Sequence, residues 1–128
     1  MAATRRTTLA ALAALPLTSL AHAATPETSP MHGLIGKMLA HPGQRDALIA
    51  ILLEGTAAMP GCLAYVVAKD KNDADALWIT ETWDSEASHK ASLALPAVRD
   101  AITRGRPLIA GFGERFETEP VGGHGLPR

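Results

Sequence analysis

The 128-residue sequence contains a single cysteine, Cys62, so it has no means of forming an intrachain disulfide. Neither sign of charge dominates, because 12 Lys+Arg stand against 13 Asp+Glu, and this balance offers no basic surface for nucleic acid or anionic lipid. The sequence also lacks an apolar run of the roughly 20 residues that a membrane span requires. A chain this small, without disulfides, needs a real hydrophobic core or a partner subunit.

Sequence signals for metals and cofactors are missing as well. The histidines show no metal-ligand spacing, and one thiol builds no thiolate site. The Gly-Phe-Gly run at 111–113 is not a dinucleotide fingerprint, because Phe116 occupies the place of the third glycine. We therefore expect no metal and no bound cofactor, and we interpret Cys62 as a small buried strand residue.

The N-terminal segment has the pattern of a targeting sequence. Arg5 and Arg6 precede an apolar stretch at 9–20, which ends in an Ala-x-Ala sequence, and this order predicts a signal peptide over residues 1–23. The paired arginines partly resemble the twin-arginine export signal. We expect an exported, periplasmic protein, with an uncleaved anchor or a disordered arm as the alternative. Residues 24–31, polar and punctuated by proline, are interpreted as a flexible linker.

The rest of the sequence alternates between strand-like and helix-like segments. Strands are expected at 33–40, 62–68, 77–83 and 111–121, and helices at 44–59, 84–94 and 97–104. Pro60-Gly61 ends the first helix, and Pro96 breaks the second helical stretch. The order β-α-β-β-α-β predicts an α+β, ferredoxin-like domain with an antiparallel sheet, spanning 32–122 and followed by a loose tail at 123–128.

The predicted strands are apolar on both faces. A ferredoxin-like sheet has helices on one face only, and its other face is then expected to alternate polar with apolar residues. The first strand instead carries Leu34 and Ile35 on opposite faces, and the third carries Leu77 and Trp78 in the same way. The simplest cover for the bare face is the same sheet of a second copy, so we expect a homodimer.

Several segments match the pattern of a known family. They are His-Pro-Gly-Gln-Arg at 41–45, Pro-Gly-Cys-Leu-Ala-Tyr at 60–65, Glu-Thr-Trp-Asp-Ser-Glu-Ala-Ser-His at 81–89 and Pro-Val-Gly-Gly-His-Gly at 120–125. In these segments the chain resembles the antibiotic biosynthesis monooxygenase family, which includes quinol monooxygenases, from about Met31 to Gly125. The resemblance implies a dimeric α+β barrel. It also implies oxidation of quinols or related phenols by dioxygen, which several members perform without metal, flavin or haem.

Such chemistry needs an electron-rich substrate, an apolar pocket, a proton acceptor and polar contacts for the resulting anion. By strand alternation Ile79, Glu81 and Trp83 share one face. The tryptophan that matches Trp83 in family members lines the substrate pocket, while a plain core residue is the alternative. Glu81 either acts as a base or orients His89, or else it forms a salt bridge with an arginine of the last helix.

His89 is the candidate proton acceptor, because the resemblance places it in the motif and an unperturbed histidine pKa of about 6.5 suits proton exchange near neutrality. The alternative is a surface histidine paired with Glu86. Arg104 and Arg106 are candidates to hold a quinolate anion, with solvated arginines as the ordinary alternative. The candidate catalytic residues are His89 and Glu81, and the candidate substrate-binding residues are Trp83, Ile79, Tyr65, Leu93 and Arg104.

Three functions remain open at this point. The first is a cofactor-independent monooxygenase that acts on a small quinol or phenolic aromatic with dioxygen. The second is a ligand-binding or stress-related barrel without turnover. The third is a haem-binding or haem-degrading relative. Haem-degrading members combine the strand tryptophan with a more distant helix histidine and a first-strand asparagine. Here Leu93 stands near that histidine's place, and residues 33–40 contain no asparagine.

Overall fold

The computed structural model describes residues 29–127 of the chain. The predicted signal peptide and residues 24–28 of the predicted linker lie outside these described residues, so both stay predictions. Residues 29–31 have no regular secondary structure. Within residues 29–127, no helix has the length and apolar character needed to cross a membrane.

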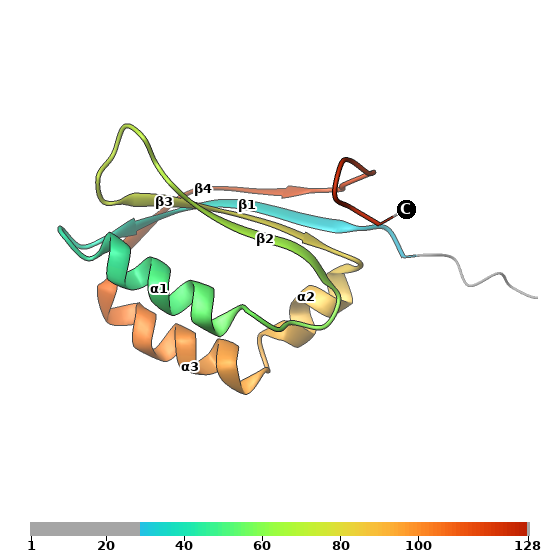
Figure 1. Cartoon of the computed structure of the whole chain (residues 1–128), viewed down its shortest axis with the longest axis horizontal. Coiled ribbons are helices and arrows are strands. Elements are labelled where there is room, and N and C mark those ends of the chain that lie inside the picture. The colour runs from blue at the N-terminus through green and yellow to red at the C-terminus, as the bar shows by residue number, and fades with distance from the viewer. Residues whose placement is uncertain (1–28, 128) are drawn as a thin grey trace, which may run out of the picture.

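All three α-helices lie against one face of a four-stranded sheet (Figure 1). The elements are β1 (His32–Ala40), α1 (Arg45–Gly55), β2 (Cys62–Lys69), β3 (Ala76–Trp83), α2 (Glu86–Ser92), α3 (Pro96–Gly105), the 3-10 turn η1 (Arg106–Leu108) and β4 (Ile109–Thr118). The strand order is β2-β3-β1-β4, and every neighbouring pair is antiparallel. The predicted α+β, ferredoxin-like fold is thus confirmed.

The first helix ends earlier than its apolar spacing predicts. Thr56 is its C-cap, because the backbone there leaves the helical conformation (φ −108°, ψ 12°), and its N–H and hydroxyl both donate to the carbonyl oxygen of Leu52. Gly55 is buried where α1 crosses α3, and a methyl group at this position would overlap the Cβ of Ala101. The two helices therefore approach closely at Gly55, and residues 56–59 turn away toward β2 instead of continuing the helix.

The second helix begins with a serine cap. The Ser85 hydroxyl accepts a hydrogen bond from the Ser88 backbone N–H at 3.1 Å, which satisfies one of the free donors of the first turn. The preceding residue, Asp84, donates its backbone N–H to the Gly61 carbonyl oxygen. Pro96 occupies the first turn of α3, where its missing N–H costs nothing.

A single arginine ties the hairpin between β2 and β3 to the start of α1. The Nη1 of Arg45 donates to the carbonyl oxygens of Asp70, Asp73 and Ala76 at 3.2, 2.8 and 3.2 Å. These carbonyls belong to the loop at 70–75 and to the first residue of β3. The arginine thereby fixes a loop that lies 25 to 31 residues further along the chain.

The two faces of the sheet differ in what covers them. On the helix face Leu48, Leu77 and Trp83 are fully buried, and Leu48 and Leu77 form the core cluster together with Ala40. On the open face the strand register aligns Val66 with Thr80, Ile35 and Phe116, and both Val66 and Phe116 are 54% exposed. The open face therefore carries apolar side chains, as the sequence suggests. The partner copy expected to cover it stays a prediction.

Candidate functional site

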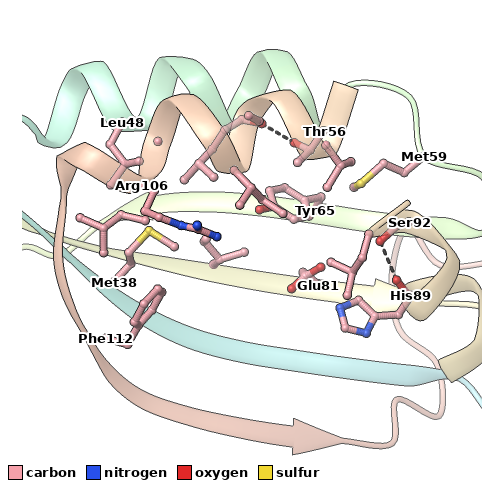
Figure 2. A pocket seen from close by; sticks show the side chains of 18 of the residues that line it. Met38, Leu48, Thr56, Met59, Tyr65, Glu81, His89, Ser92, Arg106 and Phe112 are labelled. Atoms are coloured by element: carbon pink, nitrogen blue, oxygen red, sulfur yellow. Dashed lines mark hydrogen bonds between the residues drawn. The ribbon is translucent and has the colours of Figure 1, made fainter. Parts of the chain in front are cut away.

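A cavity of about 630 Å³ lies between the helices and the sheet (Figure 2). This volume falls within the range of small-molecule sites, roughly 300–1,000 Å³. Most of its wall is apolar, and a few polar side chains interrupt it. The lining residues are Met38, Leu48, Leu52, Thr56, Met59, Tyr65, Ile79, Glu81, His89, Ser92, Leu93, Val98, Ala101, Ile102, Gly105, Arg106, Ile109, Ala110, Gly111 and Phe112.

The strands bring three of the predicted site residues into this cavity. Ile79 and Glu81 point toward the helices from β3, as strand alternation predicts. Tyr65 of β2 lies directly opposite Glu81 in the β2–β3 register, which settles its strand face. The predicted Leu93 also lines the cavity, from the end of α2, and it is 51% exposed.

His89 reaches the cavity from α2 (Figure 2). Its imidazole ring packs against the Trp83 indole, with ring centroids 5.4 Å apart. Burial is the main cause that lowers the pKa of His89, and the positive charges of His32 and Arg115 lower it further. Glu86, the alternative partner of His89, forms an ion pair with Lys90 at 3.2 Å. These effects favour the neutral imidazole of His89 at the cavity wall.

Glu81 is a half-buried carboxylate in the same part of the cavity. Burial raises the pKa of Glu81, while a hydrogen bond from Trp83 and the charges of Arg115 and His32 oppose this rise. The Trp83 Nε1–H donates to the Glu81 Oε1 at 3.2 Å. A carboxyl whose pKa is raised holds its proton closer to neutral pH, which suits exchange of protons with a bound phenol.

Trp83 supports the site from behind. Its side chain is fully buried and lies outside the cavity lining, so the core alternative describes its position better than the substrate-binding one. The indole nevertheless contacts His89 through its ring and Glu81 through its N–H. Trp83 therefore positions both candidate catalytic side chains without reaching the cavity itself.

The arginine at the cavity is Arg106, which corrects the prediction for Arg104. Arg104 pairs with Asp100 at 2.8 Å and with Glu54 at 3.6 Å, and it does not line the cavity. The physical reason is helical geometry, since a step of two residues turns a side chain by about 200°. The guanidinium of Arg106 extends into the cavity from the end opposite Glu81 and His89 (Figure 2).

Tyr65 contributes a hydroxyl that stays protonated. Burial raises the pKa of Tyr65 far above its ordinary value, and the nearby charge of Glu81 adds to the effect. Burial also raises the pKa of the Cys62 thiol, as expected for a partly buried strand cysteine that is not a nucleophile. In residues 29–127 no three side chains of His, Cys, Asp or Glu gather to form a metal site.

Sequence reasoning missed His32. It considered this histidine only for metal-ligand spacing, yet the β1–β3 register places it opposite Trp83. The ring centroids of His32 and His89 are 5.5 Å apart, so two histidines that are 57 positions apart in sequence form a pair. Strand alternation was the available signal, because His32 is separated from Leu34 and Met38 by even numbers of residues and so points to the helix face with them.

The sequence also matches a family model. The model of the antibiotic biosynthesis monooxygenases matches residues 31–104, which is more than half of the chain. The chain belongs to this family. No curated protein matches the chain significantly.

Solved structures extend the family assignment. A Chloroflexus aurantiacus protein that carries the name of the antibiotic biosynthesis monooxygenases is 70% identical, with a TM-score of 0.74, and the match covers 76% of this chain and 99% of that protein. A Caulobacter crescentus protein with the same family name is 19% identical, with a TM-score of 0.67 and coverages of 74% and 93%. A Pseudomonas aeruginosa protein is 23% identical, with a TM-score of 0.64 and coverages of 74% and 98%. The last two similarities concern the fold alone.

Proposed function

We propose that this monooxygenase-family protein oxidises a small quinol or phenolic aromatic with dioxygen and without a cofactor. The observation that carries the proposal is the distribution of polar groups in the cavity. His89 and Glu81 lie at one end of a mostly apolar wall, and Arg106 enters from the opposite end, with Tyr65 between them (Figure 2). A flat aromatic molecule fits the apolar middle, and the polar groups contact its oxygens.

The reaction begins with loss of a proton from the bound phenol. Neutral His89 accepts this proton, since burial already disfavours a resident charge on the imidazole. Tyr65, whose hydroxyl stays protonated, donates a hydrogen bond to the resulting oxyanion. The guanidinium of Arg106 stabilises negative charge at the other end of the ring. These contacts favour the ionised phenol, which is the form that gives up electrons most readily.

The ionised substrate then supplies all the electrons that the reaction needs. A quinol that gains one oxygen atom of dioxygen and becomes a hydroxyquinone loses two hydrogens in total, from its hydroxyl groups and the attacked ring carbon, and these leave with the second oxygen atom as water. No external reductant enters this balance. The apolar wall excludes bulk water from the intermediate and strengthens the contacts to its charge.

We also propose two properties that the sequence predicts. The apolar open face, including Val66 and Phe116, supports a homodimer in which two sheets pack face to face. The sequence of residues 1–23 supports export to the periplasm before folding or in the folded state. Sedimentation of the protein and N-terminal sequencing of the secreted form test these two properties separately.

The experiment for the activity is anaerobic mixing of the protein with a panel of quinols and phenols, followed by addition of oxygen. We expect oxygen consumption above the protein-free rate for at least one compound. His89→Gln is expected to lower kcat by about 100-fold or more, the usual contribution of a positioned acid–base group. If no compound consumes oxygen faster than the protein-free control, the proposal fails, and binding without turnover would point to a ligand-binding barrel.

Arg104 and Arg106 provide a matched pair of variants for the same assay. Arg106→Gln removes the guanidinium from the cavity, and we expect KM for an anionic or ionisable substrate to rise by about tenfold. Arg104→Gln makes the same chemical change two residues away, outside the cavity lining, and we expect unchanged kinetics. Equal effects of both substitutions would contradict the role assigned to Arg106.

A further inference from the structure

In the proposed reaction His89 takes up a proton from the substrate, and this proton must then reach solvent. His89 is only partly exposed, and its ring centroid lies 5.4 Å from that of Trp83 and 5.5 Å from that of His32. Trp83 is fully buried and offers no route to solvent. His32 comes from the first residue of β1 and approaches His89 with an angle of 32° between the ring planes.

The two histidines border different spaces. His89 lines the inner cavity, and His32 does not. His32 instead lines a separate hollow on the surface, next to the start of α2 and the end of β4. Glu86 and Glu119 line the same hollow. The histidine pair therefore stands between an apolar interior and an acidic, open surface.

We propose that His32 and His89 form a proton relay between the cavity and the surface hollow, an inference that rests on the proposed function for its purpose. A proton leaves one imidazole nitrogen of His89 as the His32 nitrogen gains it, and His32 then gives a proton to water from its other nitrogen. Only N–H bonds form and break, and no electron moves. Imidazole suits this step because each ring has two nitrogens that both donate and accept.

The distance between the rings permits such a transfer. The ring centroids are 5.5 Å apart, a separation at which one water molecule can bridge a nitrogen of each ring. Such a transfer also needs a path of falling energy for the positive charge. Burial disfavours the cation at His89, whereas His32 lines the open outer hollow together with the carboxylates of Glu86 and Glu119.

Other charged groups surround the pair from every neighbouring element. Arg115 of β4 opposes protonation of His89, and Glu117 of β4 and Glu86 of α2 favour it. The charges of His32 and Arg115 also lower the pKa of Glu81 on β3. Arg115 lies 3.4 Å from Glu117 and is partly neutralised by it. Arg115 and His32 both oppose a positive charge on His89, so protonation of the two rings at once is disfavoured.

The test needs no quinol and uses NMR of the histidine side-chain nitrogens in the whole protein. His32→Gln removes the outer member of the relay, and His41→Gln is the matched control at the exposed residue that follows β1. In His32→Gln we expect the pKa of His89 to rise by about 0.5 unit, because a like charge nearby is lost. In His41→Gln we expect the pKa of His89 to stay unchanged.

The second readout is the rate at which the His89 N–H proton exchanges with water. His32→Gln is expected to slow this exchange by about tenfold, and added imidazole is expected to restore it, which a merely structural role of His32 would not produce. His32→Asn serves as a second substitution if His32→Gln folds poorly. Unchanged exchange in a folded His32 variant overturns the relay, even if quinol oxidation proceeds. Slowed and rescued exchange supports the relay, even if no quinol is oxidised.

Discussion

The substitution Trp83→Phe tests whether Trp83 positions Glu81 without lining the cavity itself. The substitution keeps an aromatic ring in the core but removes the indole N–H that donates to Glu81 at 3.2 Å. It also leaves a small void where the fully buried indole was. Because complete truncation of a buried aromatic costs about 3–5 kcal/mol, we expect this partial one to cost roughly 1–2 kcal/mol. For a domain of this size that loss lowers Tm by roughly 4–8 °C per kcal/mol.

The effect on Glu81 follows from the same lost bond. A hydrogen bond to a charged group contributes roughly 1.5–3 kcal/mol, and water replaces about half of it at a half-buried carboxylate. Since about 1.4 kcal/mol equals one pKa unit, we expect the pKa of Glu81 to rise further, by about 0.5–1 unit. Carbon-13 NMR of the labelled glutamate carboxyl groups measures this shift. The acidic limb of the oxygen-consumption profile is expected to move in the same direction.

Trp78→Phe is the matched control for this experiment. The Trp78 Nε1–H donates to the Asp70 Oδ2 at 2.8 Å, so the same chemical change removes a similar bond on the open face of the sheet. We expect Trp78→Phe to raise the pKa of Asp70 and to leave the pKa of Glu81 unchanged. A folded Trp83→Phe protein in which Glu81 titrates as in the wild type would refute the role of Trp83 as a positioning residue.

Two further predictions concern stability. Because burial raises the pKa of Glu81 in the folded protein, folding favours the protonated carboxyl, and stability is lost as pH rises through the interval between the unfolded and folded values. Glu81→Gln is therefore expected to raise Tm at pH 7.5 but not at pH 4, and an equal gain at both would contradict this. Gly55→Ala is expected to lower the free energy of unfolding by about 1–2 kcal/mol in urea, because overlap with Ala101 outweighs the better helix propensity. Gly36→Ala, where a methyl group meets nothing within 4 Å, is its control and is expected to stay within about 0.5 kcal/mol of the wild type.

The fold was predictable because its signals are local. Apolar alternation located the strands, and the turn residues around Pro60-Gly61 separated α1 from β2. The end of α1 was misplaced because Leu52 and Met59 keep the helical spacing although the chain turns between them. Both side chains line the cavity, one from the helix and one from the turn. Spacing alone does not distinguish these two arrangements.

The site was predictable only in part. Ile79, Glu81 and Tyr65 follow from strand alternation and pairing, which propagate reliably along a regular sheet. Helical spacing favours Arg106 over Arg104, because Arg106 lies one turn after Ile102 on the face of α3 that lines the cavity. The contact between His32 and His89 depended on the packing of α2 against the sheet. No local sequence pattern predicts such a long-range contact.

The three hydrogen bonds that Arg45 donates to the loop between β2 and β3 limit where this protein accepts an insertion. The Arg45 guanidinium holds carbonyl oxygens at Asp70, Asp73 and Ala76, so the loop that joins β2 and β3 has a fixed length and path. Epitope tags or fused domains placed in this exposed loop would pull it from its anchor and loosen the start of α1. The stretch after Pro120, which is exposed and has no strand or helix, tolerates such additions far better.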